Sequence, residues 1–314
     1  MALVTVFGGS GFIGHYLVRL LAKAGHVIKV PTRNLVKANG LKTCGYPGQI
    51  VPVLYHQTRV KDIECCLNGV DWVVNLTGIL YPKGGNGFST VHEDLTAMIM
   101  ETAQRLEVKK AVHLSALGVD KASDSLYAQS KLLGEKLAAA NFSGVDIIRP
   151  SLVFGAEDKF FNLFARLARF TPVLPLIGGG HTKFQPIYVG DVAEAIVRIL
   201  NQPHKTGEIY ELGGQNIYSF KELLTVLLKA TDQHNILLPL PWALANMQAA
   251  LLELLPAPLL TRDQVKLLHY DNVLSGNYKG VAELGIKPQP LEMLLPFYMD
   301  RFRKGGRFHK QEAA

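Results

Sequence analysis

Residues 3–14 read LVTVFGGSGFIG, and this stretch decides the fold that we expect. Its first five residues are apolar and predict a short buried strand, and the apolar spacing of residues 15–24 predicts an amphipathic helix. Glycines at every third position between them would allow a tight turn and close approach of the backbone to a pyrophosphate. This order predicts a dinucleotide site; a glycine turn without a ligand is the alternative. The residues expected to line the site are Gly8, Gly9, Ser10, Gly11, Phe12, Ile13 and Gly14.

The end of the second predicted strand, residues 26–30, indicates which nucleotide is preferred. An NAD site usually has a carboxylate there to hydrogen-bond the ribose 2′-hydroxyl. This chain instead has Arg33, and it has no Asp or Glu before Asp62. Because the arginine fork suits a 2′-phosphate, we expect NADP(H), with NAD(H) as the alternative cofactor. Arg33 as a solvated loop charge is the alternative interpretation of that residue.

Composition narrows the class of protein. The chain has 314 residues, 48% of them hydrophobic, and a formal net charge of +7, so it can bury a large core and meet an anionic partner. We find neither zinc-finger spacing nor a basic–aromatic RNA motif, so we expect no nucleic acid partner. Cys44, Cys65 and Cys66 lack metal-ligand spacing, which predicts no metal site and a reducing compartment. The first strand begins almost at Met1, so we expect no signal or transit peptide.

Strands and helices continue to alternate along the first half of the chain. Strands are predicted at 49–55, 71–76, 111–115 and 145–149, and helices at 62–68, 91–106 and 127–140. This alternation predicts an α/β fold with a doubly wound parallel sheet and helices on both faces. The fourth strand ends at the carboxyl edge where such a sheet binds its ligand. The residues expected to contact the cofactor there are Asn75, Leu76, Thr77 and Gly78.

A candidate catalytic group follows the fifth strand. Tyr127 and Lys131 are four residues apart on one predicted helix, so both side chains lie on one face. A nearby ammonium favours the phenolate and brings a tyrosine closer to acid–base use at neutral pH. Ser115, at the end of the fifth strand, is the nearest candidate to hold a substrate oxygen. We expect all three to contact the cofactor as well; an ordinary helix pair is the alternative.

These motifs, with YAQSK at 127–131 and RPSLVFG at 149–155, resemble the short-chain dehydrogenase/reductase superfamily in its extended or atypical branch. The resemblance implies a Rossmann core at residues 1–155. It also implies a smaller C-terminal α/β region at 156–314 that returns to the core near 184–212. Further cofactor contacts are expected from Arg149, Pro150 and Ser151.

Three later strings resemble a narrower family, the nucleotide-binding accessory subunits of respiratory complex I (NADH:ubiquinone oxidoreductase) and their alphaproteobacterial relatives. They are FFNLFARLARFTPVLPLIGGGHTKFQPIYVGDVAEAI from Phe160, LLTRDQVKLLHYDNVLSG from Leu259 and FYMDRFRKGGRF from Phe297. This resemblance implies an NADP(H)-binding, non-catalytic subunit that associates with complex I subunits. It implies a cytoplasmic protein, peripheral on the inner face of the bacterial plasma membrane, or on the matrix side in a mitochondrion.

An active NADPH-dependent reductase, or a nucleotide-sugar-type epimerase or dehydratase, is the rival interpretation. Extended reductases usually carry the active-site hydroxyl a little after the fifth strand, whereas Ala116 and Leu117 follow Ser115 here. This departure favours the non-catalytic interpretation. A lipid-surface or quinone-handling protein is a third alternative.

Residues 236–260 carry Glu253 as their only charge. Prolines leave 242–255 as the continuous helix, which is too short to span a bilayer. The alternatives are a buried helix of the smaller domain, or an apolar face offered to a membrane or a subunit. A basic tail makes an anionic membrane surface a candidate partner. Its basic and aromatic residues are Arg301, Phe302, Arg303, Lys304, Arg307, Phe308 and Lys310.

Overall fold

The computed structural model describes residues 1–82, 84–204 and 206–303, which form two compact units. The first unit contains Met1–Pro150, Val189–Leu212 and Ser275–Lys287. The second contains Ser151–Tyr188, Gly213–Leu274 and the described residues from Pro288 onward. The opening segment of the first unit thus ends at Pro150 rather than at residue 155. No sequence pattern predicted that Ser275–Lys287 belongs to this unit.

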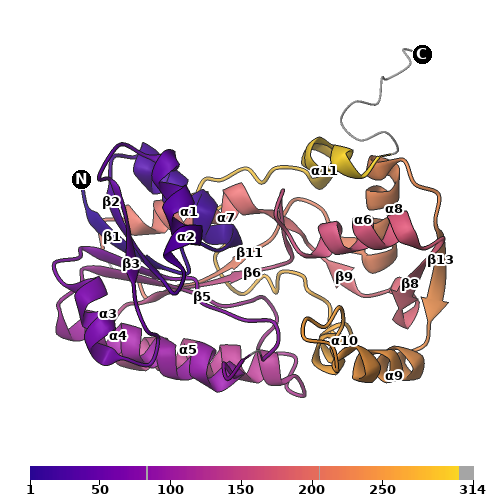
Figure 1. Cartoon of the computed structure of the whole chain (residues 1–314), viewed down its shortest axis with the longest axis horizontal. Helices are drawn as coiled ribbons and strands as arrows, with labels where there is room; N and C mark the ends of the chain where they lie inside the picture. Colours follow the sequence, from indigo (N-terminus) through magenta and orange to yellow (C-terminus); the bar gives the residue numbers. More distant parts are fainter. Residues whose placement is uncertain (83, 205, 304–314) are drawn as a thin grey trace, which may run out of the picture. The chain divides into compact units, whose positions relative to one another are not determined.

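A seven-stranded sheet forms the centre of the first unit, in the order β11-β6-β5-β4-β1-β2-β3 (Figure 1). The strands are β1 (Leu3–Phe7), β2 (Val27–Thr32), β3 (Ile50–Leu54), β4 (Trp72–Asn75), β5 (Lys110–Leu114), β6 (Asp146–Pro150) and β11 (Ile209–Leu212). All neighbouring pairs are parallel. The predicted doubly wound parallel sheet is therefore confirmed. The strand order reverses between β1 and β4, and such sheets bind ligands at the carboxyl ends of the strands beside this point.

Helices cover both faces of this sheet (Figure 1). One face carries α1 (Phe12–Lys23) and α7 (Val189–Leu200), and the other carries α3 (Val60–Leu67), α4 (Leu95–Arg105) and α5 (Leu126–Asn141). A π-helical segment, η2 (Ser89–Asp94), leads into α4, and α2 (Leu35–Asn39) with η1 (Gly40–Cys44) follows β2. Because both faces are covered, successive residues of β1 are buried on both sides of the sheet: Val4, Val6 and Phe7 are fully buried.

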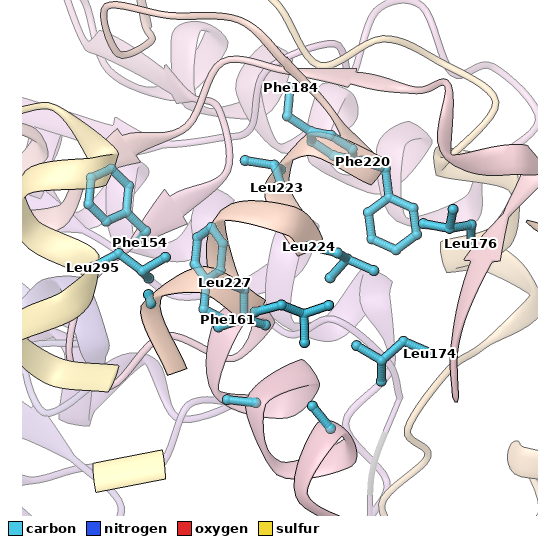
Figure 2. Packing of buried hydrophobic residues seen from close by; sticks show 14 of the residues in the cluster. Phe154, Phe161, Leu174, Leu176, Phe184, Phe220, Leu223, Leu224, Leu227 and Leu295 are labelled. Carbon is cyan, nitrogen blue, oxygen red and sulfur yellow. The ribbon is translucent and has the colours of Figure 1, made fainter. Parts of the chain in front are cut away.

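The second unit combines short strand pairs with helices. Its pairs are β7 (Val153–Phe154) with β10 (Ile187–Tyr188), β8 (Val173–Ile177) with β13 (Ile236–Leu240), and β9 (Lys183–Phe184) with β12 (Tyr218–Ser219). Its helices are α6 (Phe160–Phe170), α8 (Phe220–Thr231), α9 (Trp242–Leu252), α10 (Arg262–Leu267) and α11 (Leu291–Met299), with the short 3₁₀ turns η3 (Gly178–Gly180) and η4 (Asp300–Phe302). Figure 2 shows its core, in which Phe161, Phe220 and Leu227 are buried. A capping box of Ser219 and Glu222 starts α8, as the Ser-x-x-Glu spacing in the sequence predicts.

Helix α9 exposes much of its apolar surface. Ala245 and Ala249 are buried, whereas the side chains of Leu244, Met247 and Leu251 are 48%, 60% and 65% exposed. Of the two alternatives, these exposures disagree with a fully buried helix and favour an outward apolar face; what that face contacts stays a prediction. In the part of the chain that the structure describes, no helix combines the length and the apolar character needed to cross a bilayer.

Two arginines of the expected basic tail bind backbone oxygens within the second unit. Arg301 Nη2 donates to the carbonyl of Ala156 at 3.1 Å, and Arg303 Nε donates to that of Ala230 at 2.9 Å. Phe302 is buried in the core of this unit. The remaining predicted tail residues lie outside the described residues: Lys304, Arg307, Phe308 and Lys310.

Candidate functional site

The glycine turn between β1 and α1 is closely packed backbone against backbone. Gly8 has φ +77°, and a Cβ there would lie 3.0 Å from the carbonyl carbon of Leu76. A Cβ on Gly14 would lie 2.4 Å from the Gly8 oxygen, so the start of α1 can approach the turn only with glycine at this position. Gly11 is the N-cap of α1 and brings no capping side chain, and the first turn of α1 has no acidic residue. Its N–H groups and positive dipole end therefore suit a phosphate.

The other residues expected in this turn lie where the sequence placed them. Gly9 donates its backbone N–H to the Val6 carbonyl at 3.1 Å. Ser10 lies in the turn, Gly11 follows it, and Phe12 and Ile13 open α1. The predicted order of strand, glycine turn and helix is thus present, and the phosphate contacts expected of these residues stay predictions.

The end of β4 is held by the buried amide of Asn75. Its Oδ1 accepts from the N–H and the hydroxyl of Thr77 at 3.1 and 2.6 Å. Its Nδ2 lies 3.2 Å from Thr96 Oγ1 and 3.3 Å from His113 Nδ1. The Leu76 N–H donates to the carbonyl of Phe7 on β1 at 2.9 Å. The buried Asn75 side chain therefore fixes the conformation of the strand end through hydrogen bonds within the protein.

Gly78 brings this strand end next to the candidate catalytic helix. A Cβ on Gly78 would have two neighbours within 4 Å, Lys131 Nζ at 3.6 Å and His92 Nε2 at 3.7 Å. Both neighbours are side-chain nitrogens, so the position has room and polar surroundings. The structure therefore brings together Gly78 and Lys131, which the sequence predicted separately.

Helix α5 presents Tyr127 and Lys131 from consecutive turns. Its N-cap is Ser125, whose Oγ accepts from the N–H of Ala128 at 3.2 Å. Lys131 is buried, and Nζ donates to the Leu114 carbonyl on β5 at 2.7 Å. Burial lowers the pKa of Lys131 from 10.5 to about 8, against the attraction of the Glu135 carboxylate. The amine is thus charged at neutral pH but easily neutralised.

Ser115 follows β5 and is buried, with its N–H donating to the Ile148 carbonyl at 2.7 Å. Its Oγ has no hydrogen-bond partner among the described residues. A buried hydroxyl without a partner costs about 1–3 kcal/mol, so this atom fits a contact with a bound group or water. The next side chains, Ala116 and Leu117, carry no donor.

Arg33 lies exposed just after β2, and its Nη1 donates to Gln57 Oε1 at 3.3 Å. Gln57 in turn donates to Asn86 Oδ1, in the loop after β4. Sequence reasoning did not identify Gln57 or Asn86, because their contacts join segments about thirty residues apart. The guanidinium therefore stands at the carboxyl edge of the sheet, where Gln57 binds one of its nitrogens.

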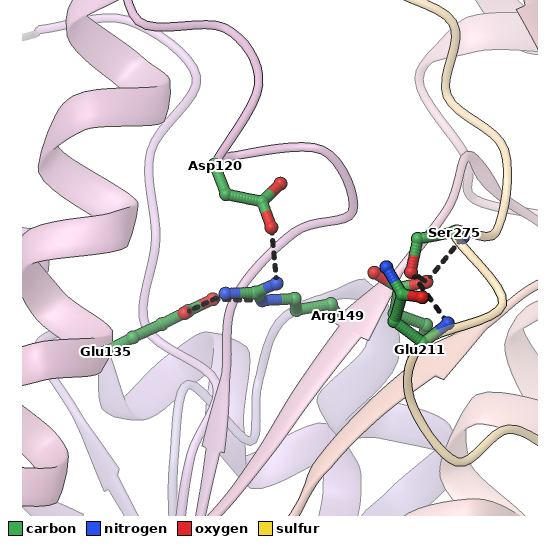
Figure 3. A network of polar contacts seen from close by, with 6 residues as sticks. Asp120, Glu135, Arg149, Glu211 and Ser275 are labelled. Atoms are coloured by element: carbon green, nitrogen blue, oxygen red, sulfur yellow. Dashed lines mark hydrogen bonds and ion pairs between the residues drawn. The ribbon is translucent and has the colours of Figure 1, made fainter.

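Arg149 is held by carboxylates (Figure 3). Its Nε and Nη2 donate to the two oxygens of Glu135 at 2.8 and 2.6 Å, and Nη1 donates to Asp120 at 3.0 Å. Burial alone would lower the pKa of Arg149, but the hydrogen bonds and charge of Glu135 raise it above its usual range. The same guanidinium lies 5.2 Å from the ring centre of Tyr278. Arg149 thus fastens α5 to the sheet, and a cofactor contact by this residue stays a prediction.

Pro150 ends β6, and Ser151 opens the second unit. There the Ser151 hydroxyl lies 2.6 Å from Asn272 Oδ1 and 3.0 Å from the Asn272 carbonyl. The cofactor contacts expected of Pro150 and Ser151 also stay predictions. In the described ranges, we find no group of three or more His, Cys, Asp or Glu residues that could hold a metal ion.

Two buried histidines, His92 and His113, lie beside the site and were not predicted from the sequence. His92 lies in η2, and His113 lies on β5 with its Nδ1 next to Asn75. Burial lowers the pKa of His113 well below its usual value, so its ring is neutral. A signal for His92 was present: His92, Leu95, Thr96 and Ile99 follow the spacing of a buried helical stripe, which places this histidine on the inner face.

A profile of the NAD dependent epimerase/dehydratase family matches residues 4–213. The chain belongs to the NAD dependent epimerase/dehydratase family. The predicted resemblance to the short-chain dehydrogenase/reductase superfamily is thereby confirmed.

Curated relatives of this family member include proteins named as mitochondrial NADH dehydrogenase [ubiquinone] 1 alpha subcomplex subunit 9. The one from Arabidopsis thaliana is 31% identical and aligns with 96% of this chain and 78% of its own length. The one from Mus musculus is 32% identical and aligns with 92% of this chain and 77% of its own. The predicted resemblance to complex I accessory subunits is therefore confirmed as well.

Solved structures agree on the fold. The Escherichia coli NADPH-dependent quinone oxidoreductase QOR2 complexed with NADPH has a TM-score of 0.73 at 20% identity, covering 94% of this chain and 99% of the other. The dTDP-glucose 4,6-dehydratase of Bacillus anthracis in complex with NAD has a TM-score of 0.73 at 18% identity, covering 95% and 96%.

Proposed function

We propose that this chain is an NADP(H)-binding, non-catalytic accessory subunit that associates with respiratory complex I. The observation that supports nucleotide binding is the glycine turn of Gly8, Gly11 and Gly14. It is so closely packed that a Cβ on Gly14 would lie 2.4 Å from the Gly8 oxygen. The relatives named as complex I subunits support the association. A nucleotide that binds only the folded chain would also stabilise it by linkage.

Arg33 supports the preference for NADP(H). It stands where the second strand of such a fold ends, and the ordinary ribose carboxylate has no counterpart before Asp62. Its guanidinium is exposed and positioned by Gln57, so its remaining donors can meet a phosphate. When bound, NADP(H) would supply hydride chemistry, and the residues that would hold it are the glycine turn, Arg33, Gly78 and Lys131.

The non-catalytic part rests on the residues after β5. A reductase needs a donor to fix a substrate carbonyl near the tyrosine, and Ala116 and Leu117 offer none. An active reductase or epimerase is the second candidate function. It is favoured by Tyr127 and Lys131 on one helix face and by the buried hydroxyl of Ser115, to which the described part of the chain offers no hydrogen-bond partner.

Purification of the native protein tests both candidates. We expect mass analysis of the released ligand to find NADP(H), complex I subunits to co-purify, and carbonyl compounds to leave NADPH unoxidised. Tyr127→Phe should retain its nucleotide. NADPH oxidation that needs a carbonyl compound and is lost in Tyr127→Phe would establish the enzyme instead.

We further propose a peripheral location at the membrane where complex I resides: the cytoplasmic face in a bacterium, or the matrix side in a mitochondrion. The exposed leucines of α9 support contact with an apolar partner. Sedimentation with vesicles that contain anionic lipid, compared with neutral vesicles, tests an anionic membrane surface as that partner. Equal sedimentation with both would exclude an electrostatic contribution.

A further inference from the structure

His92 joins the two sides of the candidate nucleotide site through hydrogen bonds. The Ile79 N–H, in the loop after β4, donates to His92 Nε2 at 3.0 Å. His92 Nδ1 lies 2.8 Å from the Ser130 hydroxyl on α5, and that hydroxyl donates to the Tyr127 carbonyl at 2.8 Å. The path therefore runs from the loop after β4 to the turn of α5 that carries the candidate tyrosine.

The donors and acceptors on this path determine the state of the ring. A backbone N–H can only donate, so Nε2 has no proton. A neutral imidazole then carries its proton on Nδ1, which donates it to Ser130, and Ser130 keeps its own proton for the Tyr127 carbonyl. Burial, followed by the nearby charge of Lys131, lowers the pKa of His92 to about 3, in agreement with a neutral ring.

The backbone at His92 packs closely against helix α5, and aromatic side chains contact its ring. A Cβ on Gly134 of α5 would lie 2.4 Å from the His92 carbonyl oxygen, so η2 and α5 meet at a distance that only glycine allows. The π-helical turn that contains His92 departs from the regular helix at this point. Phe88 stacks on the imidazole at 5.5 Å, and Tyr127 meets it edge-on at 5.6 Å. The ring can therefore turn little without breaking its hydrogen bonds.

We propose that His92 is a positioning residue for nucleotide binding, which sets the separation of Gly78 and Lys131 as a neutral Nδ1–H imidazole. This inference rests on the proposed nucleotide-binding function. From the position of a Cβ on Gly78, Lys131 Nζ lies at 3.6 Å and His92 Nε2 at 3.7 Å, so a shift of the loop that Ile79 shares with Gly78 changes the separation of Gly78 and Lys131 directly.

Three substitutions separate the two hydrogen bonds. In His92→Gln the amide oxygen can reach the Nε2 position and accept from Ile79. In His92→Asn the shorter amide can reach the Nδ1 position and donate to Ser130 but not accept from Ile79. His92→Phe keeps the ring volume and loses both bonds. We expect the Kd for NADPH to rise by less than about 3-fold in the His92→Gln protein. In the His92→Asn and His92→Phe proteins it should rise by about 10-fold or more.

His26 provides the matched control. It is also buried, and its Nδ1 accepts the Ala2 N–H at 3.2 Å, at the opposite end of the strands from the glycine turn. His26→Phe should lower the Tm and leave the Kd for NADPH unchanged. A loss of affinity in proportion to Tm across all four variants would overturn the inference, because it would indicate a purely structural role.

A second measurement needs no variant. The ¹⁵N spectrum of the imidazoles in the native protein should show His92 protonated on Nδ1 alone between pH 6 and 8. An Nε2–H signal for this residue, or an unchanged Kd in His92→Asn and His92→Phe, would overturn the inference while native NADPH binding leaves the proposed function standing. Failure of the native protein to bind NADPH would overturn both.

Discussion

Arg149 and Glu135 form a two-point ion pair in the interior of the first unit, with N–O distances of 2.8 and 2.6 Å and 4% exposure of each side chain. Glu135 lies one turn after Lys131 on α5, so this pair fixes the helix that carries the candidate site. Asp120 adds a partly exposed third charge (Figure 3). The pair therefore connects the stability of the sheet to the position of Lys131.

Glu135→Gln should lower the free energy of unfolding by about 3–5 kcal/mol, because it leaves the Arg149 charge buried with only Asp120 opposite it. Glu194→Gln is the control. It breaks an i,i+4 ion pair with Arg198 whose side chains are each 43% exposed, and it should cost less than about 0.5 kcal/mol. Chemical denaturation measures both. Equal effects in the two variants would contradict the role assigned to the buried pair.

Gly11→Val should abolish nucleotide retention while the chain still folds. A Cβ at Gly11 meets one atom, the Gly8 oxygen at 3.1 Å, so the fold needs to give only slightly. The branched side chain would nonetheless cover the N-terminus of α1, where the pyrophosphate is expected. Gly40→Ala is the control, since a Cβ there has no neighbour within 4 Å. Mass analysis of the ligand released from each variant decides, and a Gly11→Val protein with full nucleotide occupancy would refute the site.

Arg33→Ala should narrow the difference in affinity between NADPH and NADH. The binding free energy of NADPH should weaken by that of a charge-assisted hydrogen bond, about 1–3 kcal/mol, whereas the binding of NADH should not change. Arg19→Ala removes an equal charge from the exposed side of α1 and should leave the ratio of the two affinities unchanged. Calorimetry with both nucleotides checks this, and equal affinities in the native protein would end the case for NADP(H).

Lys131 should make the protein more stable as the pH rises from about 8 to 10.5. The pKa of this amine is about 8 in the folded chain and 10.5 when unfolded, so the unfolded state binds the extra proton between these values. The free energy of unfolding therefore increases with pH in this window, by about 3 kcal/mol from this group, and is independent of it below pH 8. Lys131→Met should remove the contribution of this group to the slope. An identical pH profile in both proteins would show that burial does not lower the pKa of this amine.

Local sequence signals determined the first half of the fold. The strand, glycine turn and helix at the N-terminus are specified by neighbouring residues, as is the capping box of Ser219 and Glu222, because backbone conformation there depends on side chains three or four positions away. Predicted strands of the first sheet lie within two residues of the observed ones at each end. The order of glycines, strands and helices thus sufficed to predict a doubly wound sheet and the edge at which it binds a ligand.

Tertiary structure alone decided which polar groups far apart in the sequence meet. His92 and Ser130, which are hydrogen-bonded, are 38 residues apart in the sequence. The Ser275 hydroxyl donates to the Glu211 carboxylate across 64 residues, and Ser275 begins the last segment of the first unit (Figure 3). No periodicity encodes such pairs, because each depends on how whole elements pack. The same holds for Arg149. Its motif predicted a cofactor contact, but no motif predicted the buried carboxylate of Glu135 that packing places opposite its guanidinium. A buried charge without an opposite charge beside it is costly, so this pairing depends on how α5 packs on the sheet.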